Sequence, residues 1–329
     1  MISIALCNGK AGVGTTTLLY HLAHMLSRQG AAVLAVDLDP QAELTALCLD
    51  EDEIEELWSG TAPWTVATGV RPPLDGTGDA APVPPTLLRP GLWLLPGSLR
   101  LARAEERLSH QWSAAFNGDI AAVRTITAFH QLITRAAGSV GADVVLIDVG
   151  PHLGAIARAA LVAADTVLTP LAADIFSLQG LDVLGPALRR WRHAWQRLVL
   201  PRMPPGTVVP EGNMTPLGYV LMRPEPRLDR PAERYAEWYA RIPGAYASAV
   251  LGERPPAGSA GDDGHQIAAL RNYRSLARLA RDARKPMFDL RAADGALGST
   301  ERYVRTCHRE FSALADAVLR RAEQAVGER

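Results

Sequence analysis

The chain has 329 residues, is 48% hydrophobic and carries a formal net charge of −1, which allows one large α/β domain or two small ones. The near-neutral charge excludes binding of nucleic acid or membrane through the overall field, so such binding would need a local basic patch. The three cysteines, Cys7, Cys48 and Cys307, are odd in number and widely spaced, which argues against a disulfide framework and favours a reducing cytosol.

Nothing in the sequence predicts export or membrane insertion. The N-terminus opens directly into an apolar run without the basic region of a signal peptide. No apolar run reaches the roughly 18 residues that a membrane-spanning helix needs. We therefore expect a soluble cytoplasmic protein without a membrane partner.

Residues 2–26 predict a strand, a phosphate-binding loop and a helix. The apolar run Ile2–Cys7 is typical of a buried parallel strand, and apolar residues recur at helical spacing over 18–26. Glycines between them allow backbone N–H groups to turn around a phosphate, and the helix N-terminus adds partial positive charge. The loop fits the frame G-x-x-x-x-G-K-[ST], except that a threonine stands where the phosphate-binding lysine belongs. Its residues are Gly9-Lys10-Ala11-Gly12-Val13-Gly14-Thr15-Thr16-Thr17.

Lys10 is informative because lysine is rare in this chain. Of the 34 lysine and arginine residues, two are lysines, Lys10 and Lys285. That skew is typical of coding bias. A lysine retained inside the loop nevertheless indicates a crowded phosphate site, where a compact ammonium fits and a forked guanidinium does not.

Acidic residues end two further predicted strands. The run 31–36 ends in Asp37-Leu38-Asp39-Pro40-Gln41, and the run 143–147 ends in Asp148. Carboxylates at i and i+2 of a strand point the same way, and ligands of parallel sheets bind beyond the carboxyl ends of the strands. Asp37 and Asp39 alone are equally typical of a polar turn. Together with the loop they favour a ligand site, and Asp148 would supply the carboxylate that organises a metal.

The rest of the chain predicts alternating strands and helices interrupted by irregular insertions. Strands are predicted at 92–97, 166–171 and 217–222, with a strand-like piece at 285–290. Helices are predicted at 101–108, 120–136, 182–199 and 301–325, and between Gly150-Pro151 and Ala163. The acidic run 50–56 is typical of a solvated helix face. Proline- and glycine-rich insertions lie near 50–90, 200–215 and 224–265.

The combined motifs resemble the ParA/MinD family of deviant Walker-A ATPases. The partition branch is the most similar, because Asp37-x-Asp39-Pro40-Gln41 and the segment 176–181, Phe-Ser-Leu-Gln-Gly-Leu, both resemble it. The resemblance implies a single P-loop NTPase domain over 1–329, with a doubly wound, mostly parallel α/β sheet flanked by helices. It also implies ATP and Mg²⁺ as cofactors and a homodimer that sandwiches nucleotide.

The resemblance assigns roles to individual residues. The loop from Lys10 to Thr17 matches the nucleotide cradle, and Lys10 matches the lysine that reaches the phosphates of the partner subunit. Asp39 matches the carboxylate that orients the attacking water. Thr16, Asp37 and Asp148 match the residues around Mg²⁺.

Departures from the family pattern make hydrolysis an open question. Thr15 replaces the lysine that bridges the phosphates within one chain, and loss of such a charge costs about 3–4 kcal/mol of transition-state stabilisation, or about 10²–10³ in rate. Ala11 replaces a glycine, and Arg223 stands where the family has an adenine-contacting asparagine. Either the chain binds nucleotide with weak or no turnover, or Lys10 supplies the missing charge within a dimer.

An arginine-rich segment near the C-terminus is a candidate DNA-binding surface. Spacings of three and four place most of its arginines on one side of a helix, as in a patch that contacts phosphates without reading sequence. A solvated face in an arginine-rich protein explains the same pattern, and the family resemblance favours DNA. The arginines are Arg271, Arg274, Arg278, Arg281 and Arg284.

The sequence leaves three functions open. The first is a ParA-like dimeric switch in DNA partition or positioning, with a ParB-like activator and association with the nucleoid. The second is a non-catalytic P-loop scaffold or regulator that has lost turnover. A metabolic or cofactor-loading ATPase of the same superfamily is disfavoured, because no cysteine pair indicates handling of a metal or cluster.

Overall fold

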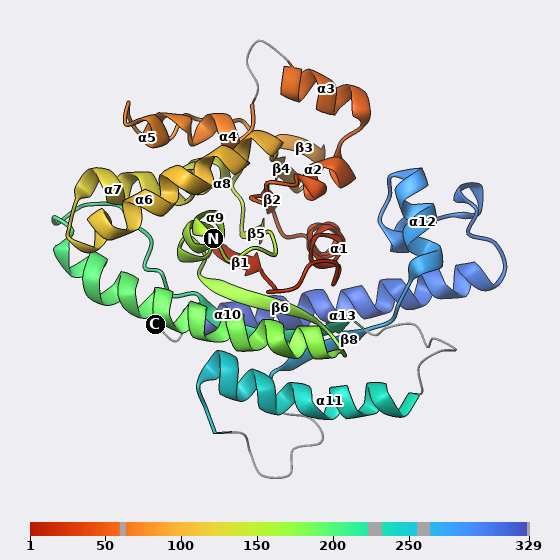
Figure 1. The fold of residues 1–329 in the computed structure, drawn as a ribbon. Coiled ribbons are helices and arrows are strands. Elements are labelled where there is room, and N and C mark those ends of the chain that lie inside the picture. The colour runs from red at the N-terminus through yellow and green to blue at the C-terminus, as the bar shows by residue number, and fades with distance from the viewer. Residues whose placement is uncertain (60–63, 223–231, 255–263, 328–329) are drawn as a thin grey trace.

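The computed structural model describes residues 1–59, 64–222, 232–254 and 264–327. At its centre is an eight-stranded sheet of order β3-β4-β2-β5-β1-β6-β7-β8 (Figure 1). All neighbouring strands are parallel except β3 and β4, which are antiparallel. The strands are β1 Ile2–Leu6, β2 Val33–Asp37, β3 Thr86–Arg89, β4 Leu92–Leu95, β5 Val144–Asp148, β6 Thr166–Ala172, β7 Thr215–Met222 and β8 Gln266–Leu270.

Helices connect the strands and cover both faces of the sheet. Short 3₁₀ or π turns occupy Leu99–Arg103, Trp195–Val199, Leu200–Arg202, Ala247–Leu251, Met287–Asp289 and Ala292–Asp294. The α-helices are α1 Thr15–Arg28, α2 Glu43–Cys48, α3 Glu51–Ser59, α4 Val66–Gly69, α5 Arg71–Asp75, α6 Ala104–Phe116, α7 Ile120–Ile126, α8 Ala128–Val140, α9 Ala155–Val162, α10 Ile175–Ala194, α11 Ala232–Tyr246, α12 Arg274–Ala283 and α13 Ser299–Gly327.

The central strands are buried on both faces, as continuous apolar runs predict. In β5, Val145 and Ile147 face the core under α6 to α10, whereas Val144 and Leu146 face the core under α1 and α13. β1 and β2 divide their side chains between the same two cores. Figure 1 shows α1, α12 and α13 away from α4 to α9, as this division requires. The predicted doubly wound, mostly parallel α/β fold is therefore confirmed.

Strand register brings the ends of three strands together. Asp37 in β2 lies opposite Asp148 in β5, and Asp148 lies opposite Leu6 in β1. Because these strands are parallel, the loops that follow them leave the sheet at one edge. The phosphate-loop sequence and both acidic turns meet at that edge.

Several predicted elements differ from the structure. The strand predicted at 285–290 is a 3₁₀ turn, because Pro286 has no N–H to donate and Met287 and Phe288 pack into the core beside α1 and α13. The outer strand positions belong to β3 and β8. β3 lies within the predicted insertion at 50–90, and β8 begins directly after the one at 224–265. The predicted insertion at 224–265 also contains α11.

Helix boundaries also differ. α10 begins at Ile175 and not at 182, because the Asp174 carboxylate accepts the Ser177 N–H at 2.8 Å and caps the helix. The helix predicted at 120–136 is interrupted at Thr127, whose hydroxyl donates to the Val123 carbonyl at 2.9 Å. Among the helices of the described ranges, none is both long and apolar enough to cross a membrane.

His21 connects α1 to the turn at Met287. Its Nδ1 lies 2.7 Å from the Thr17 carbonyl oxygen, and its Nε2 accepts the Met287 N–H at 3.0 Å. These contacts require a neutral ring with the proton on Nδ1. Burial lowers the pKa of His21 from 6.5 to about 4, despite the opposing effect of the Thr17 contact.

The lowered pKa predicts an acid-sensitive stability. The contribution of neutral His21 is complete above pH 6.5 and is lost as the pH falls toward 4, because the unfolded chain takes up the proton first. Its full size is about 3 kcal/mol. We therefore expect the free energy of unfolding in urea to fall less between pH 7 and pH 4.5 in His21→Gln than in the wild type. The control variant His110→Gln changes an exposed histidine and should show the same fall in free energy of unfolding as the wild type. The same fall in His21→Gln would contradict the role given to neutral His21.

Candidate functional site

The loop between β1 and α1 forms a backbone cradle. Gly12 and Gly14 have φ angles of 76° and 93°, which glycine adopts without strain. Gly14 is also the N-cap of α1, and no side chain caps this helix end. A Cβ built on Gly12 would meet nothing within 4 Å, so the loop is open on that side. Uncapped N–H groups at a helix N-terminus are suited to binding an anion.

The start of the loop packs tightly against α10. A Cβ on Gly9 would lie 3.0 Å from the Gly180 carbonyl oxygen, and one on Gly180 would lie 3.3 Å from Asn8 Oδ1. Glycine at both positions thus permits a close approach of two backbones. This contact gives a structural reason for the glycine in the Phe-Ser-Leu-Gln-Gly-Leu segment.

Lys10 is held by residues that follow β6. Its ammonium donates a hydrogen bond to the Asp174 carboxylate and lies 5.7 Å from the centroid of the Phe176 ring. Burial would raise the pKa of Asp174, but hydrogen bonds from Lys10 and Ser177 lower it below its ordinary value. Lys10 is therefore paired within its own chain in this conformation.

Asp37, the last residue of β2, and Asp39, just beyond it, are both buried. The Thr45 N–H and hydroxyl donate to Asp37 Oδ2 at 2.8 and 2.7 Å, and Asp39 Oδ1 accepts the Gln41 N–H at 2.9 Å. Burial raises the pKa of Asp37 to about 6, although the Thr45 hydrogen bonds partly offset it. A Cβ on Gly150 would lie 2.8 Å from Asp39 Oδ1, so the turn after β5 closes over this carboxylate.

Asp148 fits a cation site. It is 1% exposed, and its Oδ2 has no hydrogen-bond partner within the described part of the chain. Burial and the neighbouring charge of Asp37 raise the pKa of Asp148 well above its ordinary value, and the Thr16 side chain only partly opposes this rise. No three His, Cys, Asp or Glu side chains of the described residues form a metal cage. Mg²⁺ at a nucleotide needs only one or two protein ligands, since phosphates and water complete its shell.

A pocket of about 460 Å³ opens beside the loop, in the size range of small-ligand sites. From the loop its lining takes Lys10, Gly12, Val13, Gly14 and Thr17. It also includes residues that sequence reasoning did not assign to the site: Met222, Leu270, Asn272 and Tyr273. The last three come from β8 and its C-terminal end. Only a recognised strand at 266–270 could have indicated them, because residues that follow such a strand reach the same sheet edge.

The candidate DNA-binding arginines have different local surroundings. Arg271 lines the pocket of about 460 Å³ beside the loop, and its guanidinium pairs with Glu310 at 3.1 Å. Arg278 and Arg281 are exposed on α12, and Arg284 follows it, 3.7 Å from Asp50 beside the acidic helix α3. The side chain of Arg274 and the whole of Arg223 lie outside the described residues.

Comparison with known proteins agrees with this geometry. A family model described as an AAA domain matches residues 1–198. A probable plasmid-partitioning protein ParA from Thermus thermophilus is 34% identical over 194 residues, 59% of this chain and 51% of that protein. The chain spans about half the length of the curated relatives it matches.

Solved structures share the fold. A protein from Corynebacterium diphtheriae aligns with a TM-score of 0.66 and 22% identity over 98% of both chains. An ATP complex of a McdA variant from Cyanothece aligns with a TM-score of 0.63 and 18% identity, over 99% of this chain and 96% of the other. The fold and the sequence match define a protein of the P-loop NTPase class. The chain belongs to the ParA/MinD family.

The hydrogen bonds of the Thr45 hydroxyl should make a measurable contribution to stability. This hydroxyl donates to Asp37 and accepts the Gly97 N–H at 2.8 Å. Thr45→Val removes both bonds and leaves a buried carboxylate short of a donor, so we expect a loss of about 2–3 kcal/mol in urea unfolding. Thr45→Ser keeps the hydroxyl and should lose much less. Equal losses in the two variants would show that the methyl group, and not the hydroxyl, matters.

Proposed function

We propose that this chain is a ParA-like dimeric switch that binds ATP–Mg²⁺ and non-specific DNA during DNA partition or positioning, with weak hydrolysis. The observation that carries the proposal is the glycine cradle at the N-terminus of α1 together with buried Asp148, whose Oδ2 has no hydrogen-bond partner among the described residues. Thr16, in the first turn of α1, lowers the pKa of this carboxyl. One end of this arrangement suits phosphate and the other suits a cation.

The residues that would hold ATP–Mg²⁺ follow from this arrangement. The N–H groups of 12–17 would receive the phosphates, and Thr16 with Asp148 would hold Mg²⁺. The cation would supply neutralisation of phosphate charge. Asp39, buried beside Gly150, would orient a water, and Asn272, which lines the pocket, would offer its amide to the adenine. The ATP complex of the Cyanothece protein supports this choice of nucleotide.

Hydrolysis is limited in this proposal because positive charge is scarce at the loop. Thr15 is the first residue of α1 and brings a neutral hydroxyl where a lysine would bring a charge. Lys10 is engaged by Asp174, so it must leave that carboxylate before it can reach the nucleotide of a partner subunit. The same observations favour the second candidate, a P-loop scaffold or regulator without turnover.

Thr15→Lys separates the two candidates. If Thr15 is the one defect of an otherwise intact site, restoring the lysine should raise the rate of phosphate release from ATP–Mg²⁺ by about 10²–10³. The double variant Thr15→Lys, Asp39→Ala should lose that gain, because the water-orienting carboxylate is removed. A Thr15→Lys variant that binds ATP yet shows no gain would favour the non-catalytic scaffold.

DNA binding is proposed for the exposed arginines of α12 in the ATP-bound dimer, where a ParB-like protein could act as activator at the nucleoid. Light scattering should show that ATP–Mg²⁺ promotes dimerisation. The double variant Arg278→Gln, Arg281→Gln should then bind any duplex more weakly without a change in dimerisation. The slope of the logarithm of the DNA-binding constant against the logarithm of salt concentration should become smaller in magnitude by roughly one to two. The matched control is Arg302→Gln, Arg309→Gln on the exposed face of α13. Equal weakening by both pairs, or no response of DNA binding to ATP, would contradict the proposal.

A further inference from the structure

A second pocket lies apart from the pocket beside the Gly9–Thr17 loop. It is formed between α5, α6 and the 3₁₀ turn Leu99–Arg103. Its volume is about 290 Å³, near the lower end of small-ligand sites. Its floor includes Leu101, which is 1% exposed and anchored in the core below. Arginines reach it from three elements: Arg71 from α5, Arg100 and Arg103 from the turn, and Arg107 from α6.

The charges around this second pocket do not balance. Asp75 is its one acidic lining residue, and it already binds two arginines, Arg71 at 3.3 Å and Arg107 at 2.5 Å. Arg107 is further fixed by the Leu74 carbonyl at 2.8 Å. The Arg100 and Arg103 side chains have no ion pair or hydrogen bond with any described residue. The second pocket thus presents two unpaired guanidinium groups beside two that are held in place.

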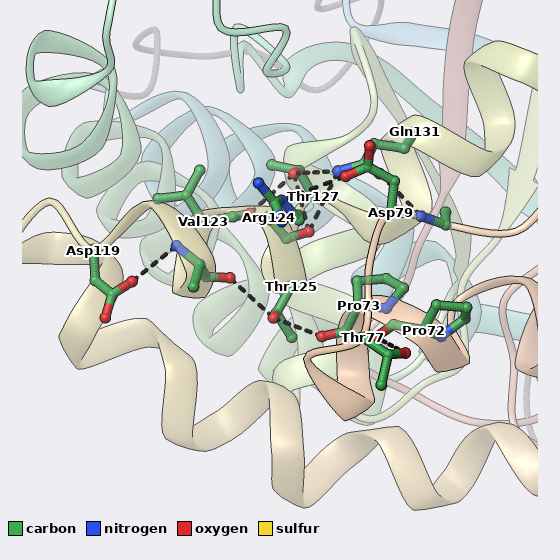
Figure 2. A network of polar contacts seen from close by, with 12 residues as sticks. Pro72, Pro73, Thr77, Asp79, Asp119, Val123, Arg124, Thr125, Thr127 and Gln131 are labelled. Atoms are coloured by element: carbon green, nitrogen blue, oxygen red, sulfur yellow. Dashed lines mark hydrogen bonds and ion pairs between the residues drawn. The ribbon is translucent and has the colours of Figure 1, made fainter.

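The wall formed by α5 is firmly anchored. The Thr125 hydroxyl donates to the Pro73 carbonyl at 2.9 Å, and the Thr77 hydroxyl donates to the Pro72 carbonyl at 3.2 Å. Figure 2 shows these contacts together with the adjoining group around Asp79, Arg124 and Gln131, which fastens the chain after α5 to α7 and α8. α5 is therefore held in place without the help of a ligand.

The turn that carries the unpaired arginines is anchored at both ends. Before it, the Gly97 N–H donates to the Thr45 hydroxyl that binds Asp37. After it, the Glu105 carboxylate accepts the N–H groups of Ala155 and Ile156 at 2.5 and 3.0 Å, at the start of α9. A preorganised site of this kind loses little conformational freedom when it binds a ligand.

We propose that this second pocket binds a small phosphorylated ligand, of the size of inorganic phosphate up to a mononucleotide. Guanidinium forks match the oxygens of a phosphate in pairs, and the apolar floor can receive a ring or sugar face. The arginines converge on one cavity from three elements, which suits a compact anion. A duplex backbone would instead need a row of cations along an open face, as on α12.

Calorimetry on the full chain tests this proposal, with orthophosphate and uridine 5′-monophosphate as probes and ATP–Mg²⁺ present at saturation to fill the loop site. At least one probe should bind at one site per chain. Arg100→Gln, Arg103→Gln should weaken that binding at least tenfold. Arg302→Gln, Arg309→Gln changes the charge equally on exposed α13 residues and should leave it unchanged.

Three results would overturn the proposal: no binding of either probe, equal weakening in both double variants, or binding of a duplex oligonucleotide alone. Failure of ATP to bind would remove the proposed function but would leave this test intact. In that case the Arg100→Gln, Arg103→Gln pair still separates binding at the second pocket from binding at the loop.

Discussion

The site depends on the register of three parallel strands. Asp37 lies opposite Asp148, and Asp148 lies opposite Leu6, so the loops after β1, β2 and β5 must meet at one sheet edge. A shift of one residue in any of these strands would exchange its two buried faces and turn its acidic end away from the others. The apolar side chains that fill both cores therefore fix the position of the carboxylates.

Burying these carboxylates has an electrostatic cost that the chain only partly offsets. The Thr45 N–H and hydroxyl donate to Asp37, and the Thr16 side chain partly opposes the raised pKa of Asp148. One oxygen of Asp148 nevertheless has no partner in the described structure. A divalent cation would offset that cost most effectively, because desolvated charges need an opposite charge nearby. In the proposed function these buried carboxylates would suit the metal, and Thr15 stands where a second phosphate-binding lysine is expected.

Much of the fold was predictable from the sequence, because the runs that form β1, β2, β5, β6 and β7 are buried and continuous. The outermost strands β3 and β8 were not, since most of their side chains are only partly buried and their runs lack the continuous apolar pattern of the central strands. In the site, the continuous motif Gly9–Thr17 indicated the cradle, and the ends of two predicted strands indicated the acids. The pairing of Lys10 with Asp174, and the reach of Asn272 and Tyr273 into the pocket, depend on contacts between distant segments. The sequence alone could not reveal them.

Calorimetry of ATP with and without Mg²⁺, on the wild type and on Asp148→Asn, tests the central claim that Gly9–Thr17 and Asp148 form one nucleotide–metal site. The account predicts that ATP binds the wild type and that Mg²⁺ tightens its binding. In Asp148→Asn most of this Mg²⁺ effect should be lost while ATP alone still binds. Absence of ATP binding to the wild type, or an equal Mg²⁺ effect in both proteins, would contradict it.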